Sequence, residues 1–202
     1  MRPGGFHSEF TKVGGGLVVL RALKRSDLTQ LLKFANSLVE ERRTNPDLGI
    51  VSLDRRVSRE DQRKFLNDVL THLEKNEVAS VAAFDGGRMV GNCDILRRKP
   101  HDVRHTGVLG IAILEGYRGM GLGEAMIGAA LRQAQRVGIW LVELEVFSNN
   151  ARARGLYRKI GFRKVGTVPN KILRRGRHID EDRMYIDLRG TDKSTGRAHR
   201  QG

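Results

Sequence analysis

The sequence has almost no cysteine. Cys93 is the only one among 202 residues. A single thiol excludes an internal disulfide and any metal site that needs several thiolates. We therefore expect no metal, and we interpret Cys93 as a small buried hydrophobic residue.

Long hydrophobic runs are also missing. No segment approaches the roughly 18 consecutive apolar residues of a membrane-spanning helix. The amino terminus lacks the apolar run of about 7 to 15 residues that a signal peptide needs. Hydrophobic residues make up 39% and charged residues 30% of the chain, which is typical of a soluble globular protein. We expect one cytoplasmic domain with no membrane partner.

Negative charge is scarce relative to positive charge. The chain has 37 Lys and Arg against 23 Asp and Glu, a net charge of +14. This excess favours anionic partners such as phosphate groups, acidic proteins or nucleic acid. Zinc-finger spacing, an aromatic RNA-binding signature and a dense basic block are all absent. A nucleic-acid partner would rest on charge alone, and we do not expect one.

Hydrophobic periodicity predicts a strand followed by two helices. Residues 17–23 form an apolar run typical of a strand. The Ser-Asp pair at 26–27 can cap a helix over 28–39, where leucines recur at helical spacing. A second helix begins at Ser58, and its apolar stripe lies within 65–73.

The rest of the chain alternates strands and helices, and the order predicts a mixed α+β sandwich. We interpret residues 1–15 as a flexible segment, 16–189 as the domain and 190–202 as a flexible basic tail. Strands are expected at 78–84, 88–96, 105–114, 139–147, 162–168 and 182–188, and helices near 122–138 and 150–160.

The segment 111–124 leaves a predicted strand, turns through glycines and enters a helix. A helix N-terminus offers unpaired N–H groups and a partial positive charge, and glycine lets the backbone approach a phosphate closely. We interpret this segment as a phosphate-binding loop to which Arg118 adds positive charge.

Two other phosphate-binding motifs do not fit the same residues. A P-loop that starts at Gly116 needs Lys-Ser or Lys-Thr after Gly121, where the chain has Leu-Gly. The dinucleotide motif G-x-G-x-x-G that starts at Gly119 needs a glycine at position 124, which is Glu124.

Two motifs resemble those of the GNAT superfamily of N-acetyltransferases. Residues 118–123, Arg-Gly-Met-Gly-Leu-Gly, fit the acetyl-CoA signature of Arg or Gln, two residues, then Gly-x-Gly or Gly-x-Ala. Residues 150–162 fit the second motif, Asn-x-x-Ala-x-x-Leu-Tyr-x-x-x-Gly-Phe. The resemblance covers about residues 16–189. It implies an α+β fold whose mixed, mostly antiparallel central sheet carries helices on both faces.

The resemblance also implies a site for acetyl-CoA as co-substrate. In the family, the strands that correspond to those around Ile111 and Val146 separate to admit the cofactor, and the amine approaches from the other side. Backbone groups of the first strand bind the pantetheine, and the glycine segment wraps the pyrophosphate. The cofactor-binding residues implied here are Ile111, Ala112, Ile113, Arg118, Gly119, Met120, Gly121, Leu122, Gly123, Glu124, Asn150 and Tyr157.

Acetyl transfer needs a general acid and a route for the proton of the amine. An ammonium with a pKa near 10.4 has no lone pair at pH 7, so its proton must be removed. Tyr157 occupies the family position of the acid that protonates the leaving thiolate. The alternative is that Tyr157 is a core aromatic residue of its helix.

The base differs from the family pattern. Relatives often have Glu just before the Leu-Gly-Ile segment, where this chain has Val108. Glu143 and Glu145 share one face of a strand and are the catalytic candidates. Asp94 and His105 are further candidates, and each acid has the alternative of a solvated or ion-paired residue.

The leading interpretation is an N-acetyltransferase that moves an acetyl group from acetyl-CoA to a primary amine of a small molecule or peptide. A protein N-terminal or lysine acetyltransferase is an alternative with the same cofactor site. A module that binds CoA or a partner without chemistry is an alternative of another class. Many relatives pair through sheet edges or helices, so a homodimer is also an expectation.

Overall fold

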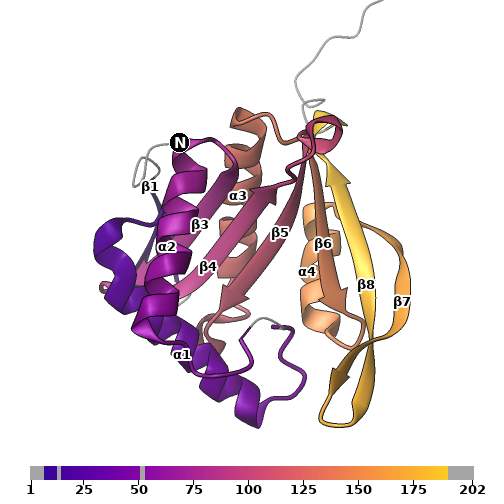
Figure 1. Cartoon of the computed structure of the whole chain (residues 1–202), viewed down its shortest axis with the longest axis horizontal. Helices are drawn as coiled ribbons and strands as arrows, with labels where there is room; N and C mark the ends of the chain where they lie inside the picture. Colours follow the sequence, from indigo (N-terminus) through magenta and orange to yellow (C-terminus); the bar gives the residue numbers. More distant parts are fainter. Residues whose placement is uncertain (1–6, 13–14, 51–52, 191–202) are drawn as a thin grey trace, which may run out of the picture.

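The computed structural model describes residues 7–12, 15–50 and 53–190 (Figure 1). The strands are β1 His7–Thr11, β2 Leu17–Arg21, β3 Val78–Asp85, β4 Arg88–Arg97, β5 Thr106–Ile113, β6 Leu141–Phe147, β7 Arg163–Arg174 and β8 Arg177–Asp187. The helices are α1 Leu28–Thr44, α2 Arg59–Glu74, α3 Leu122–Arg136 and α4 Ala151–Ile160, with short 3₁₀ turns η1 Arg25–Asp27, η2 His101–Val103, η3 Glu115–Tyr117 and η4 Leu188–Gly190.

The strands form one sheet in the order β1-β2-β3-β4-β5-β6-β8-β7. Only the β5–β6 pair is parallel among the strand pairs of the described residues. The expected α+β fold with a mixed, mostly antiparallel sheet is therefore confirmed.

Helices cover both faces of the sheet. Figure 1 shows α1 and α2 on one face, which we call the front face, and α3 and α4 behind it. β3 lies between these layers, and every residue from Val78 to Phe84 is buried. A strand covered on both faces needs apolar residues on both sides, which explains this almost unbroken apolar run. No helix lies in front of β6 and β8 in Figure 1.

The start of α2 and the end of α4 show local capping chemistry. The Ser58 hydroxyl accepts a hydrogen bond from the backbone N–H of Asp61, 3.1 Å, at the start of α2. Gly161 ends α4 with φ +113°. The expected cap at 26–27 differs, because the Asp27 carboxylate binds Arg21 and the N–H of Lys24 instead of an N–H of α1.

The expected boundary of the flexible amino-terminal segment is wrong. His7–Thr11 form β1, which pairs antiparallel with β2, so the sheet begins within residues 1–15. Phe10 packs against the core, and the strand pairing satisfies backbone groups that the free edge of β2 would leave open. Residues 191–202 of the expected basic tail lie outside the described residues.

The last two strands are longer than expected. β7 extends to Arg174, and β8 already begins at Arg177. The turn between the two strands is Arg175-Gly176, with φ of 51° and 74°. Two consecutive positive φ values suit a tight hairpin whose twist matches the strands. Most residues of β7 are exposed. Its sequence is therefore largely polar and lacks the apolar alternation from which a strand is predicted.

None of the helices within the described residues is both long and apolar enough to cross a membrane. The cytoplasmic location and the homodimer stay predictions.

Candidate active site

β5 and β6 separate part-way along their length. Residues 106–108 of β5 pair with 141–143 of β6, and no later pair joins these two strands in the described structure. Beyond this point β5 follows β4 to Ile113, while β6 follows β8 to Phe147. The two strands open as a V in Figure 1. The expected separation of these strands is thus present.

The glycine segment follows β5 at the open end of this V. The N–H of Arg118 donates to Glu115 O and that of Ala125 to Gly121 O, both 3.1 Å. No described residue accepts a hydrogen bond from the six N–H groups of residues 119–124, which lie between them. Three of the six belong to the first turn of α3, where the helix itself offers no acceptor. The segment can therefore donate several hydrogen bonds to an anion.

Glycine is required in this segment for more than one reason. Gly119 and Gly121 have φ of +83° and +88°, a region that side chains rarely adopt. A Cβ on Gly123 would lie 3.0 Å from Leu156 of α4, so this glycine allows the two helices to approach. Leu122 is buried in the core, and Glu124 pairs with Lys159 at 2.6 Å.

Arg118 does not present its charge to the loop. Its Nε donates to Ile113 O at 2.7 Å, and its guanidinium forms an ion pair with Glu41 of α1. The residue ties the end of β5 to α1 and so positions the loop. Arg152 of α4 lies over the loop instead, because a Cβ on Gly119 would meet its Nη2 at 2.3 Å. Arg152 is exposed, and its cation is the one that can reach an anion held there.

The inner edge of β5 has backbone groups without partners. The N–H of Leu114 donates to Val90 O of β4. Because backbone groups of alternate residues point to opposite sides of a strand, those of Ile111 and Ile113 point into the V. Ile113 O accepts from Arg118, and Ala112 faces β4 through its backbone. The V therefore offers hydrogen bonds from Ile111 and the N–H of Ile113 to an extended ligand.

Asn150 and Tyr157 both lie on the α4 side. The Asn150 side chain accepts from the N–H of Ala153 at 3.0 Å and caps α4. Tyr157 is 7% exposed and meets Phe162 edge to face, with 5.8 Å between ring centroids. Burial, and then the nearby Cys93 thiol, raise the pKa of the Tyr157 phenol above its usual value. The phenol therefore keeps its proton at neutral pH.

The candidate bases fall in different surroundings. Glu143 is in the last paired position of β6 and accepts from Arg98 at 2.7 Å. Glu145 lies two residues further along the same face, and its nearest cation, Arg183, is 3.7 Å away. His105 stacks on Trp140 with ring centroids 4.2 Å apart, before the closed end of the V. Of these residues, Glu145 is the one whose position and weak pairing suit a site in the V.

The profile of the Acetyltransferase (GNAT) family matches residues 39–162, more than half of the chain. This chain belongs to the GNAT family. The matched region holds the glycine segment, the two separating strands and α4.

Relatives of this GNAT protein carry names of amine acetyltransferases. An N-alpha-acetyltransferase from Sulfurisphaera tokodaii is 34% identical over 103 residues, which is 46% of this chain and 62% of the relative. An L-methionine sulfoximine/L-methionine sulfone acetyltransferase from Pseudomonas aeruginosa is 28% identical over 109 residues, 54% of this chain and 63% of the relative. The chain thus spans less than two thirds of the length of these relatives.

Solved structures share the GNAT fold over nearly their whole length. An acetyltransferase of the GNAT family from Streptococcus pneumoniae superimposes with a TM-score of 0.74 and 27% identity, covering 84% of this chain and 99% of the other.

The sequence motifs of this GNAT protein predicted most of the residues at the V, but they missed Arg152. A signal existed, because Arg152 lies in the first turn of a helix whose N-terminus was expected near a phosphate. Only the packing of α4 against the loop shows that this side chain, and not Arg118, has its charge free.

Proposed function

We propose that the protein transfers an acetyl group from acetyl-CoA to a primary amine. The observation that carries this proposal is the row of six unpaired N–H groups in a glycine segment at the open end of the V. A pyrophosphate needs such donors, and a pantetheine needs the free strand edge beside them. Membership in the GNAT family supports the same reaction.

Each side chain has a distinct task in this proposal. Residues 119–124 and Arg152 hold the pyrophosphate, and the backbone groups of Ile111 and Ile113 hold the pantetheine. Tyr157 donates its proton to the departing thiolate, since its phenol lies on the α4 side of the V and carries a proton at neutral pH. Glu145 lies on the front face of β6, where a cationic acceptor would arrive.

The acceptor is a primary amine of a small molecule or a peptide. The relatives named above act, by their names, on an α-amino group and on a small amino-acid analogue. An alternative acceptor is a protein N-terminus or a lysine. The front face of β6 and β8 is free of helices, as either acceptor requires.

A thiol-release assay tests the function directly. Acetyl-CoA would be offered with polyamines, amino acids, aminoglycosides and peptides with free or blocked amino termini, and free CoA thiol would be measured. Thiol release that depends on one amine class, with the acetylated product found by mass spectrometry, supports the proposal. Tight acetyl-CoA binding with no release for any amine would favour the module that binds CoA without chemistry. Absence of acetyl-CoA binding would contradict both.

A further inference from the structure

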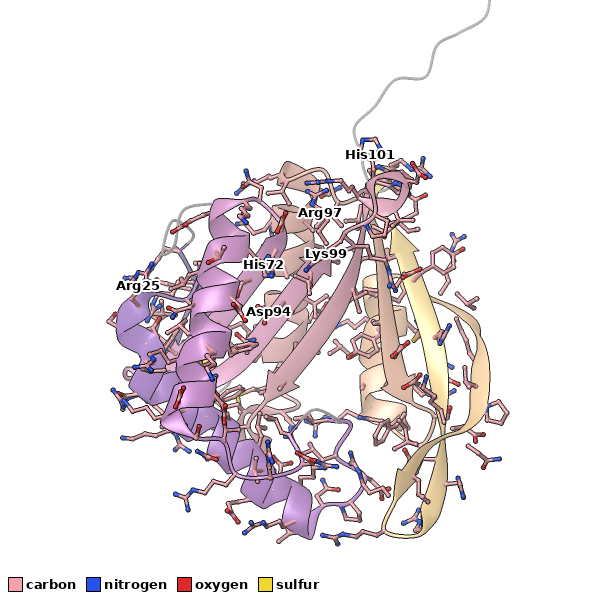
Figure 2. The ribbon with its side chains drawn as sticks, in the orientation of Figure 1. Arg25, His72, Asp94, Arg97, Lys99 and His101 are labelled. Carbon is pink, nitrogen blue, oxygen red and sulfur yellow. The ribbon has the colours of Figure 1, made fainter. Side chains whose placement is uncertain are left out.

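Three polar side chains gather on the front face of the sheet: Ser80 of β3, and Asn92 and Asp94 of β4. Ser80 and Asp94 are register partners, and the amide of Asn92 donates to Asp94 Oδ2 at 2.6 Å. The alternate residues of β4 face the other way, since a Cβ on Gly91 would meet Met126 of α3. Figure 2 shows Asp94 in front of β4, beside α2.

These side chains have more acceptors than donors. Among the described residues, Asn92 Oδ1 and Asp94 Oδ1 are buried oxygens that accept no hydrogen bond of good geometry. The Ser80 hydroxyl group is 0% exposed, and it lies close enough to Asp94 to lower the pKa of that carboxyl group. Buried polar atoms without partners destabilise a fold, so such a group needs an explanation. Bare amide and carboxylate oxygens next to one another suit a cationic N–H donor.

The cluster borders the V. Asp94 is the register partner of Gly110 in β5. Gly110 is exposed, and a Cβ built on it would meet nothing within 4 Å, so the space in front of it is open. The last β5–β6 pair is Val108 with Glu143. Two residues further along each strand, Gly110 and Glu145 lie on the same face. Asp94 is thus next to Gly110, and Glu145 lies on the same face across the opening between β5 and β6.

We propose that Asp94, supported by Asn92 and Ser80, binds the ammonium group of the acceptor in front of Gly110 and takes its proton. The inference rests on the proposed acetyl transfer. It assigns the general base to β4. The family pattern places the base at the position of Val108 in β5, and the strand pattern suggested Glu143 or Glu145 of β6.

The proton transfers balance as follows. The Asp94 carboxylate takes one proton from the ammonium and becomes a carboxylic acid. The neutral nitrogen forms a bond to the thioester carbonyl carbon, and the carbon–sulfur bond breaks. The thiolate takes the Tyr157 proton, and the phenolate takes the second proton that the nitrogen loses. Asp94 then releases its proton to water.

The surroundings of Asp94 favour this role. Burial raises the pKa of its carboxyl group, and the neighbouring Ser80 and Asn92 offset the rise only in part. A carboxylate with a raised pKa is a stronger base than an exposed aspartate. Glu181 of β8 is also buried with an unpaired Oε1, but its register partner is Phe147, at the end of β6 and further from Gly110.

The test compares two acceptors in the wild-type protein and in Asp94→Asn. One acceptor is the best amine from the thiol-release assay. The other is its analogue with fluorine on the carbon β to the amino group, which lowers the pKa of the ammonium so that the amine is neutral at pH 7. We expect Asp94→Asn to lower kcat/KM for the basic amine by about 10²-fold or more. The fluorinated amine is already neutral and needs no base, so its kcat/KM should fall little in Asp94→Asn. Asp68→Asn, an exposed acid of α2, is the control, and Asn92→Ala should raise KM for the basic amine if Asp94→Asn does not fold.

Each outcome decides one point. Equal losses for both amines at unchanged acetyl-CoA affinity would mean that Asp94 only shapes the site. Unchanged rates would mean that the cluster holds buried water. A selective loss in Glu181→Gln instead of Asp94→Asn would move the base to β8. In all three cases acetyl transfer stands and the inference fails, whereas a wild-type protein without acetyl-CoA binding overturns the proposed function and the inference together.

Discussion

Tyr157 shows how one residue can serve both packing and chemistry. Its ring contacts Phe162 and fills the core side of α4, while no described residue shares a hydrogen bond with its hydroxyl group. The hydroxyl group can donate a hydrogen bond to a thiolate that forms in the V.

Tyr157→Phe keeps the ring and removes the acid. We expect kcat to fall by about 10²-fold or more, with acetyl-CoA affinity unchanged, because the phenol acts only when the thiolate departs. Stopped-flow thiol release and calorimetry would measure the two quantities. Tyr117→Phe, whose hydroxyl bonds Asp85 instead, is the matched control, and equal rates in the two variants would remove Tyr157 from the mechanism.

Asp182 is a buried acid with a structural task. It is 1% exposed, and its Oδ1 lies within 2.8 Å of Ser148, Thr167 and Lys164. Burial alone would raise the pKa of its carboxyl group, but these hydrogen bonds lower it to about 2.

Asp182→Asn should reduce the free energy of unfolding by about 2 kcal/mol at pH 7, since one pKa unit corresponds to about 1.4 kcal/mol. Because the pKa of Asp182 is lower in the folded state, its carboxylate stabilises the fold fully at pH values above the unfolded-state pKa of 3.8. This stabilisation is lost as the pH falls through the folded-state pKa of about 2. The difference between wild type and variant should therefore shrink between about pH 4 and 2. Urea unfolding across that range measures it, with Asp68→Asn as control, and a pH-independent difference would contradict the ionic role.

At the scale of elements, the N-terminus of α3 is the critical feature. The helix begins after two glycines with positive φ, which turn the chain so that its first N–H groups point into the open end of the V. The sequence predicted this turn and the start of the helix, because the spacing of glycines is a local property that needs no tertiary information.

Gly121→Val should weaken acetyl-CoA binding by at least about tenfold, because valine disfavours φ of +88° and would move the loop out of its shape. Phe10 lies 3.7 Å from the added Cβ, so crowding is not the cause. Gly138→Val at the other end of α3, with φ of +81° and open space around it, introduces the same strain away from the loop. Calorimetry should show weak binding in the first variant and ordinary binding in the second; equal affinities would remove residues 119–124 as the phosphate site.

At the scale of the whole molecule, Arg174 joins segments that are far apart in the chain. From the end of β7 it donates to the carbonyl oxygens of Pro46, Leu48 and Ile50, and it stacks over Phe147 at 5.0 Å. Arginines near a chain turn are usually exposed, but Arg174 is only 7% exposed. It holds the chain after α1 against the hairpin of β7 and β8.

Arg174→Met should lower the free energy of unfolding by about 2 to 4 kcal/mol, because it leaves three carbonyl groups without their donor. Limited proteolysis should also cut near residues 45–50 sooner. Arg175→Met, which loses one exposed hydrogen bond to Arg43 O, should have a small effect. Similar stabilities of the two variants would show that the contacts of Arg174 contribute little.

The sequence by itself determined the family, the fold class and the glycine segment that leads into α3. These depend on short-range patterns: periodic apolar residues, glycines at fixed spacing, and a capped helix after each of two strands. It also predicted the position of Tyr157, because the residue lies within such a motif.

Only the tertiary structure decided which arginine is ion-paired and which acids lie on the same face of the sheet. Arg118 is neutralised by Glu41, 77 positions away in the chain, while Arg152 comes to lie over the loop. Asp94 and Glu145 lie on one face of the sheet, on opposite sides of β5, because β4, β5 and β6 are neighbours in the strand order. Pairing energies between distant residues depend on distance and burial, and neither quantity is encoded in local spacing. The strands β1 and β7 were misjudged for the same reason, since edge strands form through their neighbours more than through their own sequence.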